Sequence, residues 1–307
     1  MKALRKYRWP LTGALLGALV FLAVYGVRVL DPTSVDWILN NPSPDPAQHY
    51  LGWELFRRSP VHLPYIGANY NAVYPFRTSV LFTDSLPLAA LFFKLLGGVL
   101  PARFQYFGWW GLLCYMLQGG LAQAVIARIA GVQPTVDRSG SRAAIGVIMS
   151  PQQTAKLWGS VAGAGVLVLF PALTMRMFAH TALAANWLVL LALYLWLRSD
   201  EFMPTTRRAC VVWAGMGLLC AGIHLYYLPM VGLVLVGYAA RRTLQKRGPA
   251  AVLAPIAAFC AAALVELVLL GAFAVNFAGY SNGYLSGADY FGLFVPWLAP
   301  SWEQNVY

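Results

Sequence analysis

Side chains suited to acid–base chemistry gather in one segment of this chain, residues 31–105. The segment carries five carboxylates and two histidines: Asp31, Asp36, Asp45, Glu54, Asp84, His49 and His62. A carboxylate held beside a substrate can accept a proton, and an arginine can hold a phosphate by paired hydrogen bonds. Because most of the remaining chain is hydrocarbon, this segment is the first place to expect chemistry or the binding of polar ligands.

The composition predicts an integral membrane protein. Hydrophobic residues make up 59% of the 307 residues, charged residues only 11%, and the mean hydropathy is +0.61. Soluble domains carry about 25% charged residues. The net charge of +11 comes from short basic clusters beside apolar runs, a pattern typical of membrane topology and of contact with anionic lipids rather than of nucleic-acid binding. The four cysteines lie in apolar runs and are expected to be free.

Seven apolar stretches are long enough, or nearly so, to cross a hydrocarbon core that needs about 20 helical residues. They are Pro10–Leu30, Tyr106–Arg128, Leu157–Met175, Thr181–Leu197, Ala209–Leu225, Leu228–Ala240 and Ala251–Val275. No small-residue cleavage site follows the first stretch before Asp31, so we expect an uncleaved anchor. The predicted fold is an all-α polytopic helical bundle, a single transmembrane domain over residues 1–307. Residues 9–30 form its first span and residues 106–275 its six further spans.

A further apolar segment, Leu86–Leu100, is short, contains Lys94 and is followed by Pro101. If it does not cross the membrane, the amino terminus and most of the basic clusters face the cytoplasm, as the positive-inside rule requires. If it crosses, three of those clusters move outside together. We therefore predict that this segment lies in the outer leaflet and that residues 31–105 form one external loop with juxtamembrane helices. Residues 276–307 are a second external stretch.

The string DPAQHYLGWELFRR, Asp45–Arg58, predicts a short amphipathic helix with Asp45 as its cap and Pro46 in its first turn. One interpretation places it in the membrane interface, with Trp53 and Phe56 among the lipid headgroups and the two arginines on phosphates. The other makes it part of a binding site. The stretch from Tyr65 to Ser85 is rich in Asn, Gly and Tyr, which suits a polar cleft.

Four strings resemble a bacterial family of polytopic membrane proteins regarded as GT-C-like: DPAQHYLGWELFRRSP, SVLFTDSLPLAALFFKLL, FQYFGWWGLLCYMLQG and HTALAANWLVL. The resemblance covers about residues 10–300. GT-C enzymes take sugars from polyprenyl-phosphate lipids at the outer face of a membrane and share a seven-helix module. The resemblance implies a GT-C-like glycosyltransferase (hexosyl or pentosyl transfer) of the bacterial inner membrane, multi-pass, with a cytoplasmic amino terminus. Its partners would be a polyprenyl-phosphate-linked sugar donor, membrane lipids and a cell-envelope glycan or lipid acceptor, with no nucleic acid.

Sugar transfer needs a base for the acceptor hydroxyl and a positive charge for the leaving phosphate. Asp45 matches the first-loop aspartate of the resemblance and is the candidate base, with Asp84 as the second catalytic carboxylate. The candidate substrate-binding residues are His49, Arg57, Arg58, Tyr70, Arg176 and His180, the last two for the carrier phosphate. Asp45 and Asp84 are candidate ligands of a divalent cation (Mg or Mn). The loop lacks an Asp-x-Asp or Glu-x-Asp pair, however, and this departs from the metal-dependent enzymes.

Alternatives stay open at this point. The chain is also compatible with a transporter or flippase for a lipid-linked glycan, or with a non-catalytic membrane assembly subunit. We assign His224, which precedes Tyr226 and Tyr227, to the interfacial aromatic belt. GT-C enzymes generally continue with more helices or an external domain after the seventh span, so we expect this sequence to be either truncated or atypically short.

Overall fold

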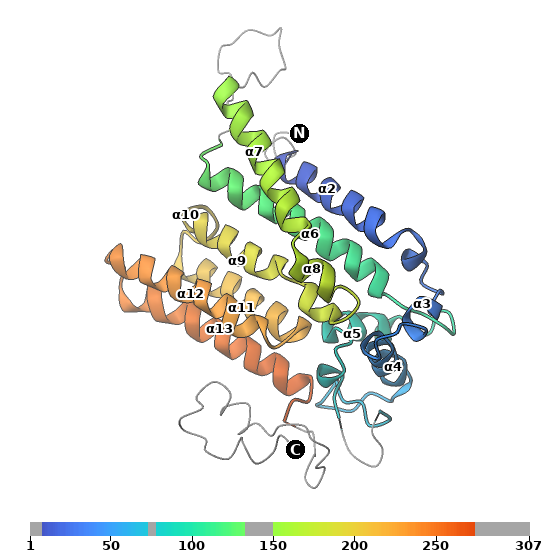
Figure 1. Ribbon diagram of the computed structural model, residues 1–307. Coiled ribbons are helices and arrows are strands. Elements are labelled where there is room, and N and C mark those ends of the chain that lie inside the picture. Colours follow the sequence, from blue (N-terminus) through green and yellow to red (C-terminus); the bar gives the residue numbers. More distant parts are fainter. Residues whose placement is uncertain (1–7, 73–77, 133–149, 274–307) are drawn as a thin grey trace, which may run out of the picture. The chain divides into compact units, whose positions relative to one another are not determined.

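The computed structural model describes residues 8–72, 78–132 and 150–273 (Figure 1). Within these ranges the chain is helical, and outside the helices the only strand-like pairing is an isolated antiparallel bridge between Ala68 and Ser79. The predicted all-α class is confirmed. The predicted external stretch 276–307 lies outside the described residues.

Each predicted span coincides with helical structure. In chain order the helices of four residues or more, 3-10 turns aside, are α2 (Arg8–Tyr25), α3 (Asp36–Leu39), α4 (Asp45–Arg58), α5 (Pro87–Leu95), α6 (Phe107–Ile129), α7 (Pro151–Val168), α8 (Pro171–Arg176), α9 (Trp187–Leu197), α10 (Ser199–Phe202), α11 (Thr206–Ile223), α12 (Tyr227–Leu244) and α13 (Pro249–Leu269). The third predicted span is divided between α7 and α8, since Pro171 starts a new helix.

Three helical segments of the described chain are long and apolar enough to cross a membrane: Phe107–Ile129, Pro151–Arg176 and Pro249–Leu269. Two shorter apolar helical segments, Pro10–Tyr25 and Thr181–Leu197, accompany them. Helix α5 has nine residues and a length of about 14 Å, less than half of a ~30 Å hydrocarbon core. Helix α5 is therefore too short to cross on its own, and the placement of Leu86–Leu100 in the outer leaflet stays a prediction.

Helix α6 is central to the packing, because α2, α7 and α9 all lie against it. Helix α12 contacts α9, α11 and α13, and α11 and α13 pack along each other (Figure 1). Buried Gln123 of α6 ties α6 to α2, since its side-chain oxygen accepts hydrogen bonds from the Thr12 hydroxyl and the Gly13 N–H. These contacts hold the helices alongside one another.

The segment between α2 and α6 is built into the domain. Gln105 donates to the carbonyls of Val29 and Asp31, and the Ser79 hydroxyl donates to the carbonyl of Leu270 at the end of α13. Asn69 donates to the carbonyl of Gly52. The described part of the predicted polar cleft is thus packed against α4 and α13.

Helix α4 has the predicted bounds, with an acidic residue in its first turn and Arg57 and Arg58 in its last, which suits the helix dipole. It ends where Ser59 precedes Pro60 and becomes extended. Two details of the prediction are wrong. Asp45 is the first helical residue and makes no cap hydrogen bond, and Trp53 is fully buried with its indole N–H bonded to the carbonyl of Phe104. Because Phe56 is also fully buried, this face of α4 packs against protein rather than lipid headgroups.

Candidate functional site

The centre of the candidate site is Asp84, in the tight turn between the short 3-10 turn Val80–Phe82 and helix α5. Asp84 and Leu86 both have left-handed backbone conformations, with φ of 51° and 56°. Such conformations cost about 1–3 kcal/mol and tend to persist at functional sites. Fully buried Ser85 between them donates to the carbonyl of His49 at 2.7 Å, and the Tyr106 hydroxyl donates to the Ser85 carbonyl. The turn is therefore clamped between α4 and the start of α6.

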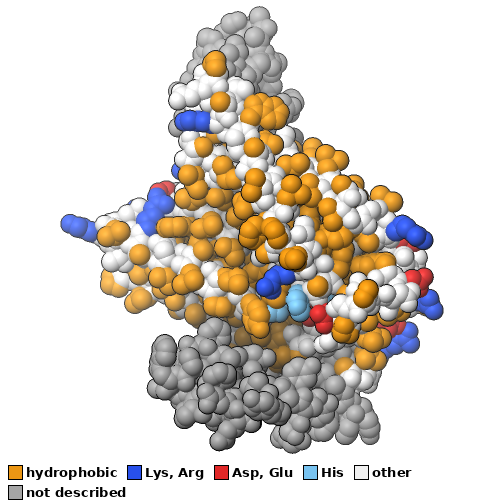
Figure 2. All heavy atoms as spheres, viewed as in Figure 1, with side chains coloured by type: hydrophobic (Ala, Val, Ile, Leu, Met, Phe, Trp, Pro, Cys, Tyr) orange, Lys and Arg blue, Asp and Glu red, His pale blue; other side chains and the backbone are white. Residues whose placement is uncertain are grey.

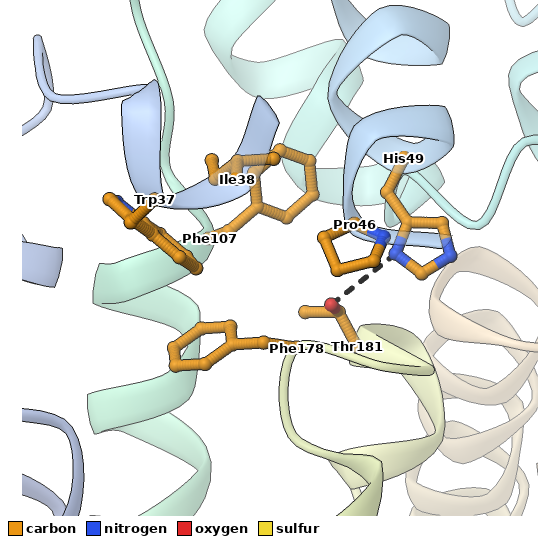
Figure 3. A pocket seen from close by; sticks show the side chains of 7 residues that line it. All are labelled: Trp37, Ile38, Pro46, His49, Phe107, Phe178 and Thr181. Carbon is orange, nitrogen blue, oxygen red and sulfur yellow. Dashed lines mark hydrogen bonds between the residues drawn. The ribbon is translucent and has the colours of Figure 1, made fainter. Parts of the chain in front are cut away.

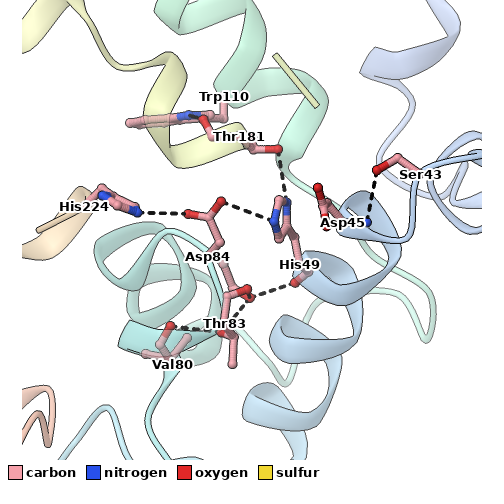
Figure 4. Close-up of polar contacts among 10 residues, drawn as sticks. Ser43, Asp45, His49, Val80, Thr83, Asp84, Trp110, Thr181 and His224 are labelled. Carbon is pink, nitrogen blue, oxygen red and sulfur yellow. Dashed lines mark hydrogen bonds and ion pairs between the residues drawn. The ribbon is translucent and has the colours of Figure 1, made fainter. Parts of the chain in front are cut away.

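Two histidines face the two oxygens of the Asp84 carboxylate (Figure 4). Nε2 of His49, on α4, lies 3.2 Å from Oδ2. Nε2 of His224, immediately after α11, lies 3.8 Å from Oδ1. The first distance allows a hydrogen bond and the second does not. Asp84 thus lies between α4 and the end of α11, two elements far apart in the chain.

The opposite ring nitrogens determine which nitrogen carries the proton. Nδ1 of His224 accepts a hydrogen bond from the Tyr226 backbone N–H at 3.2 Å. Nδ1 of His49 lies 3.4 Å from the Thr181 hydroxyl, which can donate to it. In a neutral imidazole one nitrogen is a donor and the other an acceptor. His224 therefore presents an Nε2–H donor toward Asp84, and His49 does the same when the Thr181 hydroxyl donates to its Nδ1.

Burial sets the charges at the site. Burial, and next the charge of Asp45, raises the pKa of Asp84 to about 7. Burial lowers the pKa of His49 to about 4 against the opposing effect of Asp45, and it lowers the pKa of His224 to about 4 with His180 and Arg176 adding to the shift. Both imidazoles are consequently neutral near pH 7. Asp84 is the group that exchanges a proton in this range, as a general base should.

Three other predicted site residues lie around this group. Asp45 is half-buried at the start of α4, and its charge acts on both His49 and Asp84. Arg176, the last residue of α8, and His180 are exposed, and their charges act on His224. On the face drawn in Figure 2, basic, histidine and acidic side chains lie next to one another within a largely hydrophobic surface.

The remaining predicted substrate-binding residues have other partners. Arg57 donates to the carbonyls of Pro101 and Ala102, and Arg58 pairs with Glu54 on the same helix. The ring of Tyr70 packs on His62 with centroids 4.3 Å apart. These contacts do not join the three residues to the group around Asp84, and their role in substrate binding stays a prediction. Arg57 instead holds the end of the loop beside α4.

His49 also lines a narrow recess next to the site (Figure 3). It is lined by Trp37, Ile38, Pro46, His49, Phe107, Phe178 and Thr181. These side chains fill it so closely that no space for a water molecule remains. His49 and Thr181 are both buried, and burial strengthens the electrostatic effect of their contact on the orientation of the ring.

The predicted divalent cation can be judged from the donors present. Within the described ranges, no group of three or more His, Cys, Asp or Glu side chains is arranged to hold a metal ion. The two carboxylates, Asp45 and Asp84, do not form such a group with the neighbouring histidines. We derive no step through a metal.

Four residues of the site were not identified from the sequence. His224 was assigned to the aromatic belt but faces Asp84, and Thr181, Ser85 and Gly52 hold the site in place. One signal was present in the sequence. The predicted topology puts all four histidines on the same side of the membrane, and three of them, at positions 49, 180 and 224, interact here.

Fold and site together define a helical protein with apolar helices that suit a membrane and a carboxylate–histidine group beyond the helix ends. The chain matches the family of a domain of unknown function (DUF6311) over residues 14–306, and it belongs to this family. No curated protein and no solved structure matches it. Because the match includes α4, the Asp84 turn and His224, the whole candidate site lies in the family's domain.

Proposed function

We propose that this protein is a membrane glycosyltransferase of the GT-C type, which moves a sugar from a polyprenyl-phosphate carrier to a hydroxyl group at the external face of the bacterial inner membrane. The observation that carries the proposal is the Asp84 carboxylate, held against one neutral imidazole and facing a second, with a pKa near neutrality. A base tuned to the working pH is what proton removal from a hydroxyl requires.

The proposed topology has seven spans and a cytoplasmic amino terminus. Its support is the distribution of charge along the helices. Basic residues gather where α9 is followed by α10 and α11 and where α12 ends: Arg198, Arg207, Arg208, Arg241, Arg242 and Arg247. The opposite ends of the same helices lead to the carboxylates and histidines of the site. Basic clusters on one side of the helices favour the cytoplasm for that side.

The reaction assigns a role to each charged group. Asp84 accepts the proton of the acceptor hydroxyl while that oxygen forms a bond to the anomeric carbon of the sugar. The bond from the anomeric carbon to the phosphate oxygen breaks, and polyprenyl phosphate leaves with the bonding electrons. Arg176, exposed beside the site, stabilises the charge that grows on this phosphate, with His180 as a second donor. Asp45 raises the proton affinity of Asp84 and is the second carboxylate near the acceptor.

The test uses purified protein in lipid nanodiscs with a panel of polyprenyl-phosphate hexoses and pentoses and an envelope extract as acceptor. The readout is released polyprenyl phosphate, measured by mass spectrometry, because every donor yields a product of this class. Asp84→Asn should lower the rate roughly 10²–10⁴-fold. Asp36→Asn, on α3, is the matched control and should keep the wild-type rate.

Two outcomes would count against the proposal. No release above protein-free nanodiscs with any donor of the panel would reject the enzyme. In that case, movement of the intact donor across a vesicle bilayer would favour the transporter, and its absence would favour the assembly subunit. Equal rates for Asp84→Asn and Asp36→Asn would show that Asp84 is not the general base.

A further inference from the structure

One oxygen of the Asp84 carboxylate is left without a hydrogen bond. Oδ2 faces His49 at 3.2 Å. Oδ1 is buried and has no hydrogen-bond partner in the described part of the chain. A buried acceptor left unpaired costs about 1–3 kcal/mol, so an oxygen of this kind in a functional centre indicates a missing donor.

A hydrogen-bond donor of His224 faces this oxygen. Nε2 of His224 lies 3.8 Å from Oδ1, beyond hydrogen-bond range. Its proton is fixed on Nε2, because Nδ1 accepts from the Tyr226 N–H. An acceptor and a donor therefore face each other across a gap that neither closes.

The 3.8 Å separation is short enough for one oxygen atom to form hydrogen bonds to both groups. If an oxygen atom lies 2.8 Å from both Oδ1 and Nε2, a common hydrogen-bond length, the angle from Oδ1 through this oxygen to Nε2 is about 85°. This angle is somewhat below tetrahedral and lies within the range that hydroxyl groups adopt. The bridging atom must donate to Oδ1 and accept from Nε2–H at once.

We propose that the acceptor hydroxyl binds between Asp84 Oδ1 and His224 Nε2, which makes His224 a catalytic residue that orients the nucleophile. The inference rests on the proposed function and names its acceptor class. A hydroxyl oxygen can donate one hydrogen bond and accept another, whereas an ammonium group can only donate. The site therefore selects alcohols over protonated amines.

The proton balance follows from this placement. The hydroxyl proton passes to Asp84 Oδ1, and the oxygen's electron pair forms the bond to the sugar. The Nε2–H of His224 stays on its nitrogen and keeps the oxygen lone pair aimed at the anomeric carbon. His224 thus neither gains nor loses a proton in the cycle.

The packing around His224 supports a positional role. A Cβ added to Gly222 would lie 2.3 Å from Cγ of Leu88, so the last turn of α11 sits directly on α5. Helix α5 begins three residues after Asp84. The ring also packs edge-on against Tyr226 with centroids 4.7 Å apart. Base and imidazole are therefore held on two elements that contact each other.

The experiment measures transfer to a probe acceptor, a methyl hexoside, in the same nanodiscs, and compares His224→Leu, His224→Gln and a control, His62→Leu. His62 stacks on Tyr70, outside the site. We expect His224→Leu to lower kcat/KM for the methyl hexoside roughly tenfold or more, as loss of one hydrogen bond to a reacting group would. The donor KM should not change. His224→Gln restores an N–H donor. Partial recovery of kcat/KM in this variant would show that His224 acts by orienting the acceptor and not only by supporting the fold.

A second measurement does not depend on turnover. In protein labelled with ¹⁵N-histidine, the ring signals missing from His224→Gln identify His224, and they should show the proton on Nε2. A proton on Nδ1 would overturn the proposal whether or not a donor is consumed. An unchanged acceptor kcat/KM in His224→Leu, with polyprenyl phosphate still released by the wild type, would reject the role of His224 and leave the proposed function intact. No release by the wild type would reject both.

Discussion

Substitution of Gly52 by alanine should displace the Asp84 turn from α4. The turn lies so close to this glycine that an added Cβ would be 2.5 Å from Cβ of Thr83 and 2.7 Å from the hydroxyl oxygen of Ser85. Carbon atoms in contact prefer about 3.5–4.0 Å. The turn would therefore have to retreat by about 1 Å. The Ser85–His49 hydrogen bond and the Asp84–His49 contact would lengthen with it.

The size of the effect follows from opposing terms. Overpacking costs about 1–3 kcal/mol, and the strained hydrogen bond of Ser85 adds about 1 kcal/mol. Alanine favours a helix over glycine by about 1 kcal/mol, which offsets part of this. The net loss of about 1–3 kcal/mol corresponds to a fall in Tm of roughly 2–5 °C for a domain of about 300 residues. A misplacement of about 1 Å should lower the transfer rate on the order of 10²-fold.

Two assays check this prediction in detergent or nanodiscs: the thermal midpoint and the release of polyprenyl phosphate at matched protein amounts. Gly215→Ala on α11 is the control, because no atom lies within 4 Å of a Cβ added there, so it should keep wild-type activity and gain up to about 1 kcal/mol of helix stability. A Gly52→Ala protein with the Tm and rate of the control would refute the reasoning. It would mean that the turn does not depend on its contact with α4.

Two further predictions concern charge and topology. Because an ionised Asp84 is needed as base and its pKa is raised to about 7, the transfer rate should rise with pH through this value. Asp45→Asn removes the second cause of the raised pKa of Asp84. In this variant the rise of the transfer rate with pH should therefore occur at lower pH, while activity persists. Loss of activity at all pH values would instead make Asp45 the base. In a chain whose cysteines are replaced by alanine, an impermeant maleimide should label Val61→Cys, at a position that is 60% exposed, in intact cells. It should not label Arg247→Cys, and the reverse pattern would contradict the proposed orientation.

The helices could be predicted because their signal is local. Long apolar runs with few charges, such as those that became α6 and α13, have few other ways to satisfy their backbone groups in lipid. The bounds of α4 could be read from Pro46 near its start and Pro60 just after its end. The burial of Trp53 could not be predicted, because an interfacial helix and a helix packed against protein share the same amphipathic pattern. Only the long-range contact of Trp53 with Phe104 separates these two cases.

The site was predictable in its residue types but not in its pairings. Asp84 and His49 were identified because ionisable groups are rare in this chain. The choice of Asp45 as base came from its place in the loop, whereas the proton affinity of Asp84 depends on burial, which arises from tertiary packing. His224 lies 140 positions along the chain from Asp84. Its neighbours Tyr226 and Tyr227 gave it the local appearance of an interfacial residue.

The backbone of the Asp84 turn explains why the site combines rigidity on one side with a gap on the other. The left-handed conformations of Asp84 and Leu86, on either side of Ser85, are unfavourable unless surrounding contacts hold them. Those contacts come from His49 on α4 and from Tyr106 at the start of α6. Toward α11 the turn makes no comparable hydrogen bond, and Oδ1 stays 3.8 Å from His224. A ligand that fills this gap would therefore supply the missing link between α4 and α11, so its binding should raise the thermal stability of the wild type more than that of His224→Leu.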